Sequence, residues 1–233
     1  MEHLHVRNIS WSIIELAAKY GHLCQMPCEA LTMEHLGVLN RRNKAPLHYA
    51  AESGYLHQIP QEVLNNIDFE KTKELCLLAA QKGEIYLLPS NKLTNDIVLH
   101  RHTDGRNALH AAAISKSLDQ FHPSLLTAES LAIEDYQGWT VLLLAAAHGS
   151  LNQVPTKAID EEELLRSYSG QTALDCAILN NHLDQLLGID LSDKCSQITG
   201  QAWFQKNREF ILSKQSAIAA LGSIEDNSEL EMF

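Results

Sequence analysis

The chain has 233 residues, of which 45% are hydrophobic and 20% charged, a mixture that favours one or two folded domains and excludes disorder along the whole length. Its 18 basic and 29 acidic residues leave a formal net charge of −11, which argues against general adhesion to nucleic acid or anionic lipid. The longest apolar run, Val141 to Ala147, is far shorter than the roughly 20 residues of a membrane span. These numbers exclude a membrane-spanning segment.

The N-terminal residues Met1 to His5 lack the basic start and apolar stretch of a secretory signal. We therefore expect a cytoplasmic protein. Export as an effector through a non-classical route would leave the same sequence, so that alternative stays open.

The five cysteines are odd in number and widely spread, which excludes a disulfide framework. Cys24 and Cys28 form an H-x-C-x₃-C cluster with His22, but no second ligand pair follows at zinc-site spacing. We interpret them as buried or half-buried thiols rather than metal ligands. The expected cofactor set is empty, with no metal.

An alanine-rich phrase that ends in a glycine-like turn position recurs six times along the chain. The turn positions define repeats 1 to 6, and they are separated by 33, 29, 33, 33 and 32 residues. A fixed period of this length is the signature of a repeat architecture. The turn positions are Gly21, Gly54, Gly83, Lys116, Gly149 and Asn181.

Two further phrases recur in the segments after the turns. The first, G-x-L-x-Q-x-P, starts at Gly21, Gly54 and Gly149, with weaker copies after the other turns. The second is L-T-x-E-x-L at 31–36, with related copies at 126–131 and 159–164. A short polar residue followed by an acid predicts the start of a helix. Each repeat is therefore predicted to contain a helix, a turn, a short helix and an extended connector.

These phrases resemble the ankyrin repeat family. The family's T-P-L-H-x-A-A stretch is matched by Ala45 to Ala51, Asn107 to Ala113, Thr140 to Ala146 and Thr172 to Ala177, and its D-x-x-G-x-T approach by Asp135 to Thr140. The resemblance implies an all-α fold, an ankyrin-repeat solenoid of about six repeats with short connector hairpins. The L-x-Q-x-P and L-T-x-E-x-L phrases are similar to those of bacterial and phage ankyrin proteins.

The expected domains are an ankyrin repeat domain at 1–200, a C-terminal capping helix at 201–221 and an acidic flexible tail at 222–233. Apolar residues at helical spacing support the capping helix, and an amphipathic partner-binding helix is the alternative. Leu47, Leu109, Leu142 and Leu174 are expected to fill equivalent sites between stacked repeats.

Two departures from the family pattern affect the geometry. The proline of the L-x-Q-x-P phrase predicts a short or broken second helix. The third repeat is four residues short and carries Thr72 where the family has glycine before the helix, so its connector is the least regular.

Catalytic motifs are missing from the sequence: neither G-x-S-x-G nor a phosphate-binding loop is present. We therefore expect no enzyme activity.

His48 and His110 occupy the family's T-P-L-H histidine position, for which the resemblance implies structural hydrogen bonding between repeats. His100 and His102 alone would make a weak metal site. The acidic run 160–163 is interpreted as a charged first helical turn.

Mapping the family's architecture on the chain places connector tips at roughly 40–44, 70–73, 101–106, 135–139 and 167–171. The resemblance implies that such tips and the adjoining helix ends bind partners. Basic side chains gather at the first three tips, aromatic side chains at the last two, and Lys82 and His148 lie at helix ends. The candidate partner-binding residues are Arg41, Arg42, Lys44, Lys71, Lys73, Lys82, Arg101, Arg106, Tyr136, Trp139, His148 and Tyr168.

The expected function is a non-enzymatic protein-protein interaction module whose concave connector-tip and inner-helix face binds an acidic segment of another protein, sequestering or inhibiting it. The alternative is a nucleic-acid or nucleotide-binding protein that uses the basic tips of repeats 2–4 and the aromatic tips of repeats 5–6 as stacking platforms. A small-molecule enzyme or sensor would need a deep pocket that stacked repeats rarely supply. In the plainest interpretation, the tip residues are ordinary solvated connectors.

Overall fold

The computed structural model describes residues 12–159, 164–166, 168, 170–182 and 185. These residues form helices and no β-strand, so the described fold is all-α. None of the described helices is long and apolar enough to cross a membrane. The acidic run 160–163, the predicted capping helix and the predicted tail lie outside the described residues. The chain divides into two compact units between Leu125 and Leu126.

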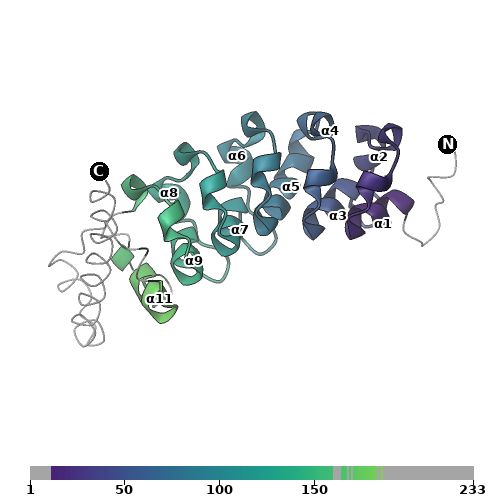
Figure 1. Ribbon diagram of the computed structural model, residues 1–233. Helices are drawn as coiled ribbons and strands as arrows, with labels where there is room; N and C mark the ends of the chain where they lie inside the picture. Colours follow the sequence, from purple (N-terminus) through teal and green to yellow (C-terminus); the bar gives the residue numbers. More distant parts are fainter. Residues whose placement is uncertain (1–11, 160–163, 167, 169, 183–184, 186–233) are drawn as a thin grey trace, which may run out of the picture. The chain divides into compact units, whose positions relative to one another are not determined.

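Four longer helices of the first unit pack in chain order, α1 on α3, α3 on α5 and α5 on α7. The short helices α2, α4 and α6 lie along one side of this row (Figure 1). The bounds of the α-helices are α1 Ile13–Tyr20, α2 Met33–Leu36, α3 Pro46–Ser53, α4 Gln61–Asn65, α5 Phe69–Lys82, α6 Asn95–Val98 and α7 Ala108–Ser115. The 3₁₀ turns are η2 Leu23–Gln25, η3 Cys28–Ala30, η4 Leu56–Gln58, η5 Ile85–Leu87, η6 Ser90–Lys92, η7 Leu118–Gln120 and η8 Pro123–Leu125.

The second unit repeats the same order of elements. Its helix α9 packs against α11, and two 3₁₀ turns, η9 and η10, follow α9. The bounds are α8 Ala128–Leu131, α9 Val141–His148, η9 Leu151–Gln153, η10 Thr156–Ala158 and α11 Ala173–Leu179.

The sequence turn positions end the longer helices in the left-handed conformation. Gly21 has φ 74° and Gly54 has φ 79°, a region that favours glycine because it lacks a Cβ. The next amide donates a hydrogen bond to the carbonyl five residues earlier, from Tyr55 N to Ala50 O at 2.8 Å. This arrangement satisfies carbonyls that would otherwise lack a partner at the helix end. The predicted turn is confirmed.

The second half of the repeat is a broken helix, as predicted. The L-x-Q residues form the 3₁₀ turn η2 in repeat 1, and Pro27 then precedes the next 3₁₀ turn, η3. Proline has no amide hydrogen and its ring clashes with the preceding turn, so a continuous helix cannot pass through it. The L-T-x-E-x-L phrase gives only the four-residue α2.

The third repeat has a longer helix in place of a connector hairpin. Asp68 caps α5, because its side chain accepts a hydrogen bond from Lys71 N at 2.9 Å. The predicted connector tip at 70–73 is therefore wrong, and Lys71 and Lys73 lie in the first turns of a 14-residue helix. The shortened repeat has too few residues for a hairpin, and helical hydrogen bonds satisfy the backbone instead.

The glutamine of the L-x-Q-x-P phrase links neighbouring repeats. Gln58 donates from Nε2 to Gly21 O at 3.0 Å and accepts from Cys24 N at 3.3 Å through Oε1. One amide side chain thus satisfies both a turn carbonyl and a 3₁₀ amide of the preceding repeat, since it carries a donor and an acceptor. We call this pair of bonds the glutamine link.

The same link recurs in both units. Gln120 donates to Gly83 O at 2.8 Å and accepts from Tyr86 N at 3.2 Å. In the second unit, Gln185 bonds Gly149 O and Leu151 N, both at 2.9 Å. Repeat 3 has leucine at the glutamine position, and there the buried Glu84 accepts from Leu56 N at 3.2 Å.

The expected leucines are all buried in their units: Leu47, Leu109, Leu142 and Leu174 are at most 3% exposed. In repeat 3 the equivalent position, seven residues before the turn, holds the fully buried Cys76. Burial raises the pKa of the Cys76 thiol to about 12. Cys76 is therefore a small apolar part of the core.

Candidate functional site

The first connector is a tight hairpin over residues 40–44. Asn40 N donates to Lys44 O at 2.9 Å, and Asn40 Oδ1 accepts from Arg42 N at 2.8 Å and from Lys44 N at 3.1 Å. Asn43 adopts φ 58°, which asparagine tolerates better than most residues. The hairpin presents Arg41 and Arg42 as exposed side chains.

This hairpin is anchored to two helices of the first unit. Asn40 Nδ2 donates to Glu15 Oε1 of α1 at 2.7 Å and to the Tyr49 hydroxyl of α3 at 3.0 Å. Glu15 and Tyr49 are buried at 7% and 5% exposure. Because the anchor is buried, the position of the two arginines relative to α1 and α3 is set by the fold.

A second hairpin of the first unit spans residues 102–106. His102 N donates to Arg106 O at 2.9 Å, and Asp104 Oδ1 accepts from Arg106 N at 3.0 Å. Gly105 has φ 80°, the left-handed position of this turn. Arg101 is exposed beside it, and Arg106 is half-buried.

The second unit contains two more connectors of this kind. Asp135 N donates to Trp139 O at 2.8 Å, while Asp135 Oδ1 accepts from Gln137 N at 2.9 Å and from Trp139 N at 3.0 Å. Tyr136 is 70% exposed, and Trp139 is half-buried. The last connector is closed by Tyr168 N donating to Gln171 O at 2.8 Å, with Tyr168 half-buried.

Hairpin residues and helix ends are close together within a repeat. Lys44 forms an ion pair with Glu52, the next-to-last residue of α3. Lys82 and His148 are the exposed last residues of α5 and α9. In repeat 2 this ion pair joins the tip to the end of the helix.

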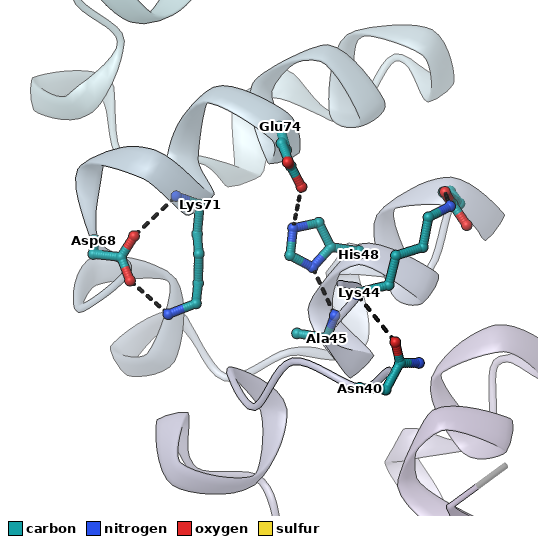
Figure 2. Close-up of polar contacts among 8 residues, drawn as sticks. Asn40, Lys44, Ala45, His48, Asp68, Lys71 and Glu74 are labelled. Atoms are coloured by element: carbon teal, nitrogen blue, oxygen red, sulfur yellow. Dashed lines mark hydrogen bonds and ion pairs between the residues drawn. The ribbon is translucent and has the colours of Figure 1, made fainter. Parts of the chain in front are cut away.

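Several of the predicted basic side chains are neutralised locally. Lys71 Nζ lies 2.6 Å from Asp68 Oδ2, and Lys73 Nζ lies 2.9 Å from Glu70 Oε1 (Figure 2 draws the first pair). Arg106 Nε is 3.9 Å from Asp104 Oδ2. The first unit therefore has mixed charge along this surface, which also carries the exposed side chains of Arg41, Arg42, Lys82 and Arg101.

His48 joins repeats 2 and 3. Its Nδ1 accepts a hydrogen bond from Ala45 N at 3.0 Å, and its Nε2 lies 2.8 Å from Glu74 Oε2 of α5 (Figure 2). The Glu74 contact is close but poorly aligned for a hydrogen bond, so we treat it as an electrostatic contact. Burial lowers the pKa of His48, and the neighbouring Glu74 carboxylate partly offsets this. His48 thus contacts Glu74 of the next repeat, while its hydrogen bond to Ala45 lies within its own repeat.

His110 has a capping role at the start of α7. His110 N donates to Asn107 Oδ1 at 3.1 Å, and Asn107 N donates to His110 Nδ1 at 3.3 Å. This reciprocal pair satisfies two amides at the helix start. The sequence phrase predicted a hydrogen-bonding histidine, and the described bonds lie within its own repeat.

Metal-ligating side chains are dispersed in the described part of the chain, where no three His, Cys, Asp or Glu residues gather around one point. The rings of His100 and His102 meet edge to face, with their centroids 5.2 Å apart. Burial lowers the pKa of His102 most, and the neighbouring His100 lowers it further.

Cys24 and Cys28 are exposed, so the expectation that they are buried or half-buried is wrong. They lie on the surface turns η2 and η3.

Two polar groups important to this surface were missed from the sequence. Asn40 was treated only as part of a tip, although it anchors the hairpin to Glu15 and Tyr49. The glutamine link was seen only as a phrase. Its signal was a polar residue recurring at one point of the period, which an apolar stacking interface does not by itself require.

Comparison with known proteins adds no relative: neither a scan of protein-family models nor a search of curated proteins gives a match.

Proposed function

We propose that this chain is an ankyrin-repeat protein that acts as a non-enzymatic protein-interaction module. The observation that carries the proposal is the anchored hairpin 40–44, which holds exposed arginines beside the end of α3. A preorganised hairpin backbone loses little conformational entropy on binding. Arginine and aromatic residues are enriched among the residues that contribute most to binding at protein interfaces. The repeated phrases support the family, and its solenoid is part of the proposal.

The proposed binding surface in each unit consists of the hairpins and the adjoining helix ends. In the first unit it includes Arg41, Arg42 and Arg101, and in the second Tyr136 and Trp139. The proposed partner is a protein with an acidic segment that meets Arg41 and Arg42. Because Lys71 and Lys73 pair with neighbouring carboxylates, they are expected to contribute little to electrostatic steering. Sequestration or inhibition of that partner would follow from occupying its acidic segment, and a cytoplasmic location is proposed with it.

The proposal is tested by affinity capture from lysate with variants of the tips. The test variant carries Arg41→Glu, Arg42→Glu and Tyr136→Ala. The control carries Lys157→Glu and Tyr86→Ala, which change an exposed cation and a 66% exposed tyrosine away from the hairpins. We expect a protein retained by the wild type and the control to be lost from the tip variant.

A second measurement addresses the charge of the partner. For a purified partner, the association rate of the wild type should fall as salt rises, and the tip variant should bind slowly with a flatter salt dependence. Equal capture by the wild type and the tip variant would reject the hairpin surface. Nucleic acid in the wild-type eluate, lost in the tip variant, would favour the nucleic-acid alternative.

A further inference from the structure

Helix α1 exposes an apolar stripe on one side. Ile13, Leu16 and Tyr20 are 60%, 38% and 59% exposed. They follow one another at spacings of three and four residues, which places them on one face of a helix. An isolated exposed apolar residue is common in proteins, but a stripe along a whole helix indicates a surface that something covers.

Two of these helix positions, those of Ile13 and Leu16, are buried in α3, and the first is also buried in α5. Counted back from the turn glycine, Ile13 corresponds to Pro46 in α3 and to Leu75 in α5, both buried. Leu16 corresponds to Tyr49, which is 5% exposed. Helices α3 and α5 each pack on the helix before them. At Ile13 and Leu16, helix α1 thus exposes positions that are buried in α3.

The glutamine of repeat 1 supports the same conclusion independently. Gln58 and Gln120 use their amides to bond the preceding repeat. Gln25 occupies the equivalent position in η2 and makes a local contact with His22 Nδ1 at 3.4 Å. Its amide is exposed. Both parts of a stacking interface, the apolar stripe and the amide, are therefore present at the start of the first unit.

The segment that directly precedes this face is residues 1–11, joined to α1 through the cap residue Ser12. Residues 1–11 can reach roughly 36 Å when extended, against about 12 Å for an eight-residue helix. The segment contains the apolar residues Leu4, Val6, Ile9 and Trp11.

The start of α1 also favours contact with this segment. Ser12 and Glu15 form a capping box, with Ser12 N donating to Glu15 Oε2 at 2.7 Å and Glu15 N donating to Ser12 Oγ at 3.2 Å. Capping boxes are often accompanied by a contact between the residue before the cap and the fourth helical residue. Here those two positions hold Trp11 and the half-exposed Leu16.

We propose that residues 1–11 pack on the Ile13, Leu16 and Tyr20 stripe as an intramolecular cap of the first repeat, with Trp11 against Leu16. Attachment to α1 gives the segment a high effective concentration at this face, which a separate molecule lacks. The inference is independent of the proposed partner binding.

The test uses the full chain with Trp139→Phe and Trp203→Phe, so that Trp11 is the single tryptophan. We expect blue-shifted emission and an acrylamide quenching constant well below that of N-acetyltryptophanamide. Adding Ile13→Asn and Leu16→Asn should raise quenching to the free value. A control with Val38→Asn and Leu39→Asn, which changes exposed apolar residues elsewhere, should leave it unchanged. Circular dichroism confirms that each variant is folded.

Three results would overturn the proposal. Trp11 as strongly quenched as the free indole in the starting protein would show that the stripe is not covered by this segment. Protection that is insensitive to the Ile13 and Leu16 changes would place Trp11 elsewhere. Protection that disappears on dilution, with a matching change in mass by light scattering, would assign the stripe to a second copy of the chain.

Discussion

Gly21 and Gly54 end equivalent helices in the left-handed conformation, but they differ in their surroundings. A Cβ on Gly21 would lie 2.7 Å from the ring of Tyr55, whereas the nearest atom to a Cβ on Gly54 is at 3.8 Å, in Lys82. In repeat 1, glycine therefore serves both the turn and the close approach of the next repeat.

We expect Gly21→Ala to destabilise the protein more than Gly54→Ala. Each change places an ordinary residue at positive φ, at a cost of about 1–2 kcal/mol, and Gly21→Ala must also displace the tyrosine ring, adding about 1 kcal/mol or more. Urea denaturation measures both. Equal losses in the two variants would show that the Tyr55 contact is unimportant.

His48 should make stability depend on pH. Its pKa is lowered in the folded protein, so between the folded pKa and the unfolded value near 6.5 the unfolded chain binds more protons. The free energy of unfolding should therefore fall as pH drops below about 6.5. His48→Gln should flatten this slope in denaturation curves measured between pH 7 and pH 5. A slope unchanged in the variant would assign the pH dependence to other groups.

The η turns show how a recurring polar residue can organise a repeat interface. We expect Gln58→Ala to lower the free energy of unfolding by about 1–2 kcal/mol, because it removes two hydrogen bonds to repeat 1. Gln25→Ala removes only a local contact with His22 and should change stability by less than about 0.5 kcal/mol. Chemical denaturation of the two variants makes the comparison. Similar losses in both would mean that the link adds no stability.

Helix α5 depends on a single side chain for its start. Asp68→Ala should cost about 1 kcal/mol, because the cap to Lys71 N is lost. Asp68→Asn keeps an acceptor at the cap but removes the charge, so most of the stability should be retained. The hydrogen bond from the Lys71 side chain lowers the pKa of Asp68. If thermal unfolding shows equal losses for Ala and Asn, the charge rather than the cap supports the helix.

Stability of the first unit as a whole is expected to come from contacts between neighbouring repeats rather than from any repeat alone. Leu109 is fully buried in α7 and Leu39 is 45% exposed before the first hairpin. Leu109→Ala should cost about 2–5 kcal/mol, and Leu39→Ala less than about 0.5 kcal/mol. Guanidinium denaturation compares them. A loss below about 1 kcal/mol for Leu109 would argue against stacking as the main source of stability.

Periodicity predicted the described helices and their turns closely because each depends on a local cause. The glycines at 21, 54 and 83 allow positive φ, and proline breaks the segment that follows. The connectors at 40–44 and 135–139 were placed from the resemblance to the ankyrin family, and the asparagine, aspartate and glycine that they contain favour tight turns. Between repeats 2 and 3 there is no glycine at the connector and Asp68 caps α5 instead, so the expectation of a tip at 70–73 was wrong.

Side-chain pairing could not be predicted in the same way. Lys71 and Lys73 counted as members of a basic stretch until the helix placed Asp68 and Glu70 beside them. Asn40 reaches Glu15, 25 residues away, only after α1 and α3 have packed. Contacts over such separations depend on which helix faces meet, and the repeat period alone does not specify those partners.

By itself, the sequence determined the period and the helix ends, because glycine, proline, capping residues and alanine act within a few residues of chain. Its resemblance to the ankyrin family implied the all-helical class and the positions of most hairpins. Only the tertiary structure decided that glutamine links the repeats, that Cys24 and Cys28 are exposed, and that α1 presents an apolar stripe. Those features arise when distant segments pack, since burial and hydrogen-bond partners are properties of the packed repeats and not of the local phrase.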